Sequence, residues 1–509
     1  MRLAPLPLLL VFCAANALAG GSAGHVGWID VSSDADLEDW SEMLSEACDR
    51  PAPDAAAWTT VRVANEEEFA AALASAQSQP TEILLQKDIT LTQSYVIEQD
   101  VWIHGESGRP RLIGGDEDGW VDLEFHRPSP DTARNIHLSD IALENVYVRA
   151  WTYLAYNPVE DITLVDVHFL GTEPGEIAQA DGYTLYEPLV QFSRVEATTD
   201  GSTQICGSVF AQHAPGNQVT FDPKMLALWR TASVEIRNNL FVGYMHGAIT
   251  ANGSVNTDAS CTDGTSTCTI DWDYAQHNTR LIIDDNIVQR DPSSYGEDHG
   301  FYVWGAEKLS ITDNSIRGFT NAASGACVKV ASVRDAEIIG NSCDSSMFFY
   351  VHVYGSTPEI PQWFGAPPLF ESVDIRDNEI CQAYTPCTGK ECSDVCGIGY
   401  SRYNLPDYAP FPQATMLGEL DVTIEGNDLS GGVLRLFSAG TPDSADTVHP
   451  DELLYAGSGG YPDVRYDPTA FTILDNTGMS TNGTTNPACD FHPDVISSGN
   501  LTADGSSCP

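Results

Sequence analysis

The chain has 509 residues and carries 72 acidic against 24 basic side chains, a formal net charge of −48 at pH 7. This charge excludes nucleic acid as a natural partner, because phosphate contacts need a basic face, and it disfavours anionic membrane surfaces. Two interpretations of the acidity remain open. The carboxylates can serve as solvated surface charge, or some of them can bind calcium, which takes several carboxylate oxygens.

The first segment, residues 1–19, has the features of a secretory signal peptide. Met1-Arg2 is a positive start, an apolar run from Leu6 to Ala15 follows, and Ala17-Leu18-Ala19 supplies small residues before Gly20. The apolar run is too short to span a bilayer, and no later segment is long and apolar enough. The sequence therefore predicts a protein secreted to an extracellular or periplasmic space, with no membrane insertion.

A helix is predicted after an N-terminal extension, residues 20–58, that contains no clear repeat. Asn65 can cap this helix, Glu66-Glu67-Glu68 place acids in its first turn, and helix formers follow from Phe69. Glu68 stands three residues after Asn65, close to a capping box. A helix at the start of a solenoid closes the open end of its core.

One short phrase returns seven times between residues 234 and 478. Two apolar residues stand two apart, an asparagine follows three later and, except in the last copy, another apolar residue stands two beyond it. The alternation indicates a half-buried strand and the asparagine a bend, so the repeat at varying intervals predicts a solenoid. The copies are Val234 to Phe241, Leu281 to Val288, Leu309 to Ile316, Ala336 to Cys343, Val373 to Ile380, Val422 to Leu429 and Phe471 to Gly478.

The phrase resembles the rung of right-handed parallel β-helices of the pectate-lyase-like superfamily. The resemblance implies an all-β fold: a single-stranded right-handed parallel β-helix over residues 59–480, with an N-terminal capping helix and long inserted loops. Residues 481–509 then form a C-terminal cap or tail. It also implies that the asparagines stack in an internal ladder. They are Asn239, Asn286, Asn314, Asn341, Asn378, Asn427 and Asn476.

Two earlier segments keep the alternation but not the asparagine. Ile136 to Leu143 and Ile162 to Phe169 put Ile141 and Val167 at that position. The superfamily includes lyases, hydrolases, epimerases and adhesins, so the fold alone does not select a function.

The cysteine content favours disulfides. Thirteen cysteines less Cys13 in the signal leave an even number in an exported chain. Cys261 and Cys268 are expected to pair, and Cys489 and Cys508 to hold the C-terminal tail. The group Cys381, Cys387, Cys392 and Cys396 can form disulfides or bind zinc, and the disulfides are favoured because the spacing lacks a Cys-x-x-Cys pair.

A second strand-like run near most phrases carries the candidate chemistry. If Phe301 and Val303 point inward, Tyr302 points outward, and Val328 and Val330 inside put Lys329 outside. We predict Lys329, His352 and Tyr302 as catalytic residues, in one row roughly 10 Å long because rungs stack at about 4.8 Å. The predicted substrate-binding residues are Trp304, Tyr350, Tyr354, Arg435, His246 and His299.

The row predicts a secreted enzyme that acts on a polysaccharide, and we expect it to be a monomer. Aromatic side chains suit the C–H faces of sugars. In β-elimination on a uronic acid polymer, Lys329 would take the proton beside the carboxylate, and Tyr302 or His352 would protonate the leaving oxygen. Arg435 or a calcium ion would neutralise the carboxylate.

Two alternatives stay open. The first is a non-catalytic β-helix that binds glycans or acts as an adhesin. The second is a hydrolase with paired carboxylates, because Asn256-Thr257-Asp258, Asp284-Asp285, Asp298-His299-Gly300 and Lys329 follow the order of the polygalacturonase motifs. We regard that match as weak, since Asp284-Asp285 stands at the bend before Asn286. For calcium, the acidic groups are Asp116-Glu117-Asp118 and Glu297-Asp298.

Overall fold

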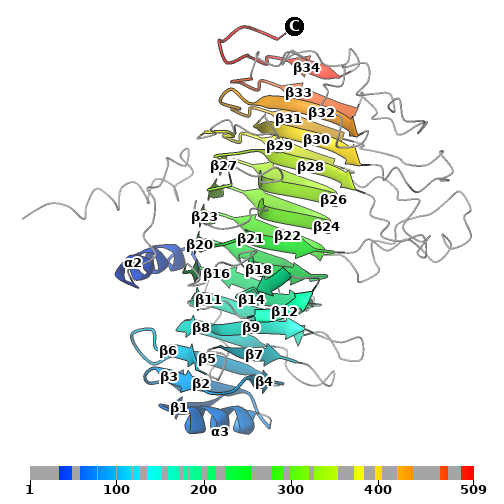
Figure 1. The fold of residues 1–509 in the computed structure, drawn as a ribbon. Helices are drawn as coiled ribbons and strands as arrows, with labels where there is room; N and C mark the ends of the chain where they lie inside the picture. Colours follow the sequence, from blue (N-terminus) through cyan, green and yellow to red (C-terminus); the bar gives the residue numbers. More distant parts are fainter. Residues whose placement is uncertain are drawn as a thin grey trace, which may run out of the picture.

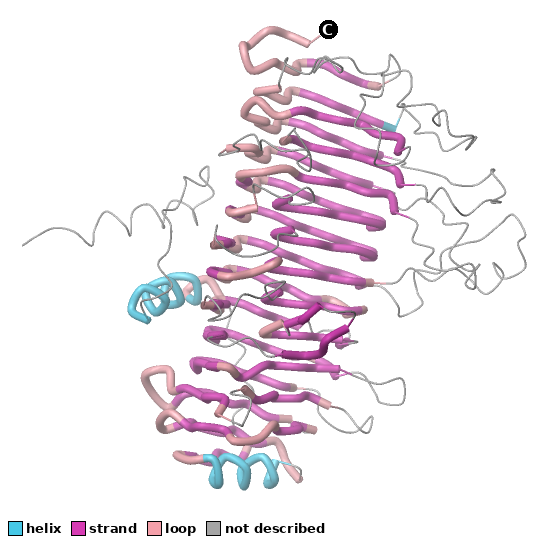
Figure 2. Tube along the Cα trace, viewed as in Figure 1, coloured by secondary structure: helices cyan, strands magenta, loops and turns pink. Residues whose placement is uncertain are grey.

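The strands of the molecule wind into one long coil whose neighbouring turns pair in parallel (Figures 1 and 2). The pairing confirms the predicted all-β, right-handed parallel β-helix. The computed structural model describes residues 34–48, 58–76, 78–98, 100–115, 120–126, 135–151, 159–171, 176–180, 183–186, 188–193, 195–196, 203–213, 224–253, 278–291, 299–319, 326–352, 372–382, 396–403, 421–439, 470–479 and 495–508.

Three series of paired strands form three faces of the coil. In most turns the chain passes through the first face, bends at the asparagine position, and continues through the second and the third face. The strands of the first face are β1 (Thr59–Val63), β2 (Thr81–Leu85), β5 (Val101–Gly105), the first half of β8 (Ile136–Glu144) and of β11 (Ile162–Gly171), β16 (Thr203–Cys206), β19 (Val234–Arg237), β22 (Asn278–Asp284), the second half of β24 (His299–Thr312) and of β26 (Ala326–Ile339), β29 (Ser372–Arg376), β31 (Asp421–Glu425), β33 (Phe471–Leu474) and β34 (Ile496–Ser498).

The second face is narrower and follows the bend. It contains β3 (Ile89–Leu91), β6 (Arg111–Gly114), the second halves of β8 and β11, β17 (Val209–Gln212), β20 (Leu240–Gly243), β23 (Ile287–Arg290), β25 (Ser315–Arg317) and β27 (Ser342–Cys343).

The third face completes each turn. It contains β4 (Tyr95–Ile97), β7 (Val121–Phe125), β9 (Val146–Trp151), β14 (Val190–Ser193), β18 (Lys224–Trp229), β21 (Gly247–Asn252), the first halves of β24 and β26, β28 (Met347–His352), β30 (Gly397–Tyr403) and β32 (Val433–Ala439). Two pairs form small separate sheets: the parallel β10 (Val159–Glu160) with β15 (Val195–Glu196), whose valines are buried in the core of the coil, and the antiparallel β12 (Glu176–Ala180) with β13 (Tyr183–Tyr186).

The asparagines stack at the bend between the first and second faces, as predicted. Each side-chain amide donates to the next asparagine's carbonyl oxygen at 2.8–3.0 Å, from Asn239 to Asn476. Each carbonyl oxygen also accepts from the preceding asparagine's backbone N–H, as Asn341 does from Asn314. Ser208 begins the ladder and Asn500 ends it. The ladder therefore satisfies these fully buried amides at every turn.

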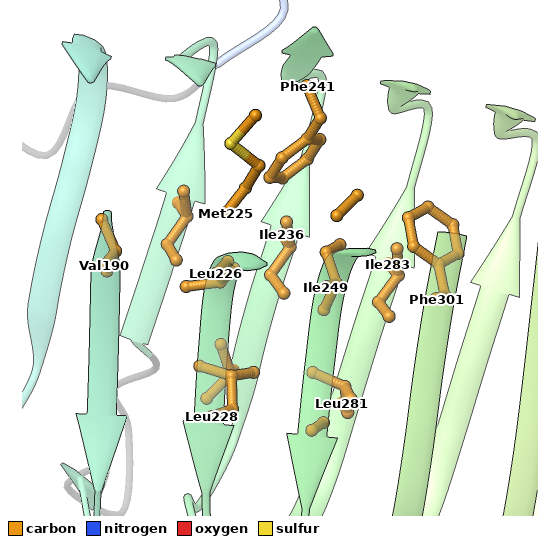
Figure 3. Packing of buried hydrophobic residues seen from close by; sticks show 14 of the residues in the cluster. Val190, Met225, Leu226, Leu228, Ile236, Phe241, Ile249, Leu281, Ile283 and Phe301 are labelled. Carbon is orange, nitrogen blue, oxygen red and sulfur yellow. The ribbon is translucent and has the colours of Figure 1, made fainter. Parts of the chain in front are cut away.

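The interior of the coil is apolar. Phe169, Phe210 and Phe241 stack on successive turns with ring centroids 4.6 Å apart. Figure 3 shows the same packing across the strands, where Ile249 and Phe301 point into the core beside Ile283. Register between turns thus brings like side chains together in the core as well as in the ladder.

A short helix closes the N-terminal end of the coil, as predicted. Helix α3 (Glu66–Ala76) lies beyond β1 in Figure 1 and buries Phe69 and Leu73. Its first turn is capped twice, because Asn65 Oδ1 accepts from the Glu68 N–H and Glu68 Oε2 accepts from the Ala64 N–H.

Helix α2 (Asp34–Ser45) packs on the outside of the second face (Figure 1). Leu37 and Leu44 lie against the outward side chains of β11, β17 and β20. Ser41 donates to Asp166, and a disulfide joins Cys48 to Cys206. These contacts attach the N-terminal extension to the body. No helix within the described ranges is long and apolar enough to cross a membrane.

The coil continues past residue 480. Strand β34 pairs with β33, and Asn500 adds an eighth asparagine to the ladder. Cys508 is disulfide-bonded, and its expected partner Cys489 lies outside the described residues. Cys381 pairs with Cys396, which confirms the disulfide interpretation for these two residues of the four-cysteine group. Cys261, Cys268, Cys387 and Cys392 lie outside the described residues.

The residue before each ladder asparagine has a positive φ and alternates between aspartate and glycine over much of the coil. Asp377, for example, lies between Gly340 and Gly426. Asp285 and Asp313, in contrast, are consecutive. Burial and the charges of Asp284 and Asp313 raise the pKa of Asp285 to about 6. At neutral pH the ionised Asp285 carboxylate therefore lowers the stability of the folded state.

Replacing Asp285 with asparagine is expected to stabilise the protein at pH 7–8. The carboxyl pKa is higher in the folded than in the unfolded state, so its unfavourable contribution is present above about pH 6 and disappears as the pH falls toward 4. Asparagine tolerates the positive φ. Because the side chain is half-buried and screened, we expect a gain of about 1 kcal/mol at pH 7.5, vanishing near pH 4. Thermal unfolding at both pH values measures it, with Asp377→Asn as control. An equal gain at both pH values would contradict the electrostatic cause.

Candidate functional site

The third face is the side of the coil on which the predicted catalytic residues lie. Of the two helices in the described part of the chain, α2 packs on the second face and α3 on the N-terminal end, so neither covers it. Long connections leave the ends of its strands, among them residues 253–277 after β21 and 404–420 after β30. In repeat proteins such insertions often build the binding face.

Alternation along β24 and β26 sets the side chains as predicted. Phe301, Val303, Val328 and Val330 are fully buried in the core. Tyr302 and Lys329 are half-buried between them, on the outer side. Both strands run without a break from the third face into the first, over 14 residues each, which makes this the longest continuous pairing in the coil. The two side chains therefore project from a rigid base.

The register confirms one part of the predicted row and corrects another. Tyr302 pairs with Lys329, and Thr250 precedes Tyr302 on β21. The residue beside Lys329 on the next strand is Phe348, not His352. His352 pairs with Tyr403, four residues further along β28, about 13 Å from the level of Lys329. The three residues thus do not form one row, because the chain reaches β28 earlier than in the preceding turns.

Tyr302 is the centre of the observed cluster. The Lys329 Nζ atom lies 5.0 Å from the centre of the Tyr302 ring. The buried His299 ring, three residues earlier on β24, lies 5.5 Å from the Tyr302 ring, at 60° between planes. A cation against an aromatic face gains about 0.5–2 kcal/mol, so this contact favours the ammonium form of Lys329.

A disulfide fixes the start of β26 close to this cluster. Cys327, two residues before Lys329, is fully buried and bonded to Cys343. Beside it, burial raises the pKa of the Asp344 carboxyl to about 6, and its Oδ2 accepts from the Gly318 N–H. These contacts hold the entry to β26 and therefore the position of Lys329.

The predicted substrate-binding residues fall into three groups. Trp304 and His246 are half-buried and His299 is buried. For Tyr350 and Arg435 the structure gives the strand position: Tyr350 pairs with Ala331, and Arg435 lies three strands beyond Lys329, about 14 Å away. Tyr354 lies outside the described residues. Arg435 therefore lies further along the coil than Lys329.

Sequence reasoning missed Trp229, the large aromatic residue at the end of β18. Its side chain is 49% exposed, and Arg230 lies 6.0 Å from the centre of its ring. Trp229 pairs with Asn252, which in turn pairs with Trp304. No repeat phrase marks β18, and the long connection of residues 253–277 follows its neighbour β21, so the sequence gives no signal for this proximity.

The first and third faces differ in charge. Outward positions of the first face pair acids with bases, as Arg237 does with Glu235 and Asp284, and Arg376 with Asp374. The residues that pair in register with Lys329, one on each strand from β9 to β32, include Arg149 and Arg435. Among these described residues there is no Asp or Glu. Arg149 binds Asp122 of β7, the preceding strand of this face, and Glu124 of β7 pairs in register with it. The basic stretch of the third face therefore begins after β9 and contains Lys329 and Arg435.

The hydrolase motif is not brought together. Asp284 and Asp285 lie at the bend after β22, where Asp284 binds Arg237, whereas His299 and Lys329 lie on the third face. Asn256 to Asp258 and Asp298 are outside the described residues. Among the described side chains, no three of His, Cys, Asp and Glu are grouped as a metal site requires. The acidic groups 116–118 and 297–298, for which calcium binding and solvated surface charge were both left open, are outside them too.

Comparison with known proteins adds one similar structure. No protein-family model matches the sequence, and no curated protein matches it. Among solved structures, the chain is similar to the crystal structure of alginate lyase from Paenibacillus sp. str. FPU-7, with 10% identity, a TM-score of 0.25, and coverage of 72% of this chain and 94% of that one. A likeness at this level decides neither fold nor activity, so the assignment of a parallel β-helix stands on the strand pairing and the asparagine ladder.

Proposed function

We propose that the protein is a polysaccharide lyase that cleaves a uronate-containing polymer by β-elimination on the third face. The observation that carries the proposal is the contact of the Lys329 ammonium with the Tyr302 ring, on adjacent strands of a locally basic surface. A cation and a phenol side by side are the two groups that elimination beside a carboxylate requires.

Lys329 is assigned to the substrate carboxylate. The proton on the neighbouring carbon becomes acidic only when the charge of that carboxylate is neutralised. The sequence predicted Lys329 as the base, but its contact with the ring face favours the protonated form, which cannot accept a proton. An ammonium is suited instead to bind the carboxylate and to stabilise the charge that develops on it.

Tyr302 is assigned to proton transfer. As a phenolate it takes the proton from the carbon beside the carboxylate. The new carbon–carbon double bond forms as the bond to the glycosidic oxygen breaks. The phenol then returns the proton to that leaving oxygen, which restores the phenolate. The Lys329 cation stabilises the negative charge of the phenolate between steps, and no water or external reactant is consumed.

The elimination is tested directly by ultraviolet absorbance, since it leaves a conjugated double bond in the product. The full-length protein is incubated with a panel of anionic polysaccharides, with and without calcium. We expect absorbance to rise with at least one polymer, and Tyr302→Phe to lower the rate by about a thousandfold while the fold is kept. Unchanged absorbance across the panel would overturn the proposal, as would full activity of Tyr302→Phe.

A non-catalytic glycan-binding protein is the second candidate. The exposed Trp229 and the half-buried Trp304 on the same face favour sugar binding whether or not elimination occurs. Binding of an anionic polysaccharide without any change in absorbance would select this candidate.

A further inference from the structure

On the third face, one set of residues pairs in register from strand to strand, and every second residue of this set is aromatic. We name this set of positions the aromatic column. It takes one residue from each of the strands β9, β14, β18, β21, β24, β26, β28, β30 and β32. The alternate members are Trp151, Trp229, Trp304, Tyr350 and Phe437.

The positions between the aromatic residues are small or short and polar: Ser193, Asn252, Ala331 and Ser401. The structure describes the side chains of one complete interval. Trp229 is 49% exposed, Asn252 and Trp304 are half-buried, and the asparagine lies between the two indoles. In this interval a short side chain, Asn252, separates the two large rings.

The interval of the column has a chemical meaning. Neighbouring strands lie about 4.8 Å apart, so the aromatic residues on every second strand lie about 10 Å apart. That distance is close to the length of two pyranose rings in an extended polysaccharide. A chain lying parallel to the axis of the coil would thus present an equivalent sugar to each aromatic residue, and indoles stack on the C–H faces of sugars.

The neighbouring charges select the class of polysaccharide. The residues two positions before the aromatic column on each strand include Lys329 and Arg435, and also Arg149, which binds Asp122 of β7 at the start of the column. Neither this set nor the aromatic column has an Asp or Glu at the described strand positions from β9 to β32, although the chain has 72 acidic residues. This surface is complementary to a polyanion, whereas most of the molecule repels one.

We infer that the aromatic column is the binding track of a linear anionic polysaccharide with a two-sugar interval, which lies along the axis of the coil. The acidic nature and the cleavage of this ligand rest on the proposed function, but the track itself rests on the register. Trp229 and Trp304 hold sugars on one side of the residue that Lys329 binds, and Tyr350 and Phe437 stand at the continuation of the track.

The test measures binding of β-1,4-linked oligomannuronates of two, four, six and eight sugars by calorimetry, with cello-oligosaccharides of equal length as neutral probes. We expect affinity to rise with each added pair of sugars and the neutral probes to bind at least tenfold more weakly. Trp229→Ala and Trp304→Ala should each weaken binding of the octamer by roughly tenfold, and the double variant by roughly a hundredfold.

Trp102→Ala is the matched control, since Trp102 is half-buried on the first face, and it should bind as the parent does. The ultraviolet absorbance of the same samples is followed. Binding without absorbance change would keep the track and remove the lyase assignment. Cleavage that is unaffected in the double tryptophan variant would keep the lyase and overturn the track. No gain in affinity beyond the disaccharide, or equal binding of neutral probes, would overturn it as well.

Discussion

Lys329→Arg is expected to retain elimination activity within about tenfold of the parent, whereas Lys329→Met is expected to lower kcat/KM by about a thousandfold or more. Arginine keeps the positive charge beside the substrate carboxylate but cannot act as a base. Methionine keeps the length and packing of the side chain and removes the charge. Rates of absorbance increase at several substrate concentrations measure both variants.

This pair separates the two possible roles of Lys329. If the lysine were the base, as the sequence alone suggested, arginine and methionine would be equally inactive. Lys308→Met is the matched control, because Lys308 is exposed on the first-face half of β24 and should leave the rate unchanged. Equal loss in Lys329→Arg and Lys329→Met, with Lys308→Met active, would contradict the assignment of charge neutralisation.

Asn341→Ala is expected to be the most destabilising single change considered, by about 3–5 kcal/mol. The substitution removes the acceptor of both the Asn314 backbone N–H and the Asn314 side-chain amide, and these two groups are fully buried. It also removes the donor to the Ile311 carbonyl and to Asn378. A buried donor without an acceptor costs about 1–3 kcal/mol. The Asn314 backbone N–H loses its side-chain acceptor, whereas the Asn314 side-chain amide keeps its bonds to the Ile283 and Thr312 carbonyls.

A coil of stacked turns need not unfold in one step, so a local measurement is preferable to a single midpoint. Hydrogen exchange should lose protection in β24 and β29, which pair with β26 on the two sides of the Asn341 turn, before β2 and β5 are affected. Asn500→Ala serves as control, since it ends the ladder and disturbs one neighbouring asparagine. Similar exchange in the parent and Asn341→Ala would show that the ladder contributes little to stability.

Much of the fold could be predicted because the repeat phrase encodes it locally. Alternation fixes which side chains enter the core, as Phe301 and Val328 show, and the asparagine fixes the bend. The register of one third-face strand against the next is not encoded locally, because it depends on the length of the connection that precedes the strand. The chain takes four residues from Cys343 to Met347 but ten from Ile316 to Ala326, and this difference displaced His352 from the predicted row.

The candidate site was predictable only where paired strands belong to successive turns that are joined by short connections. Tyr302 and Lys329 lie on such strands, and their pairing was anticipated. Trp229 and Trp304 are brought within two strands of each other across a long connection, and the Cys48–Cys206 disulfide closes a separation of 158 residues. Pairings of that length are set by the whole coil and leave no local pattern.

Mass spectrometry of the products formed from an anionic polysaccharide in ¹⁸O-labelled water tests the central claim, elimination on the third face. The account predicts oligosaccharides with an unsaturated terminal sugar, one water lighter than hydrolysis products and without the label at the cleaved bond. It also predicts that folded Tyr302→Phe releases them about a thousandfold more slowly. Labelled, saturated products, or an intact polymer across the full panel, would contradict it.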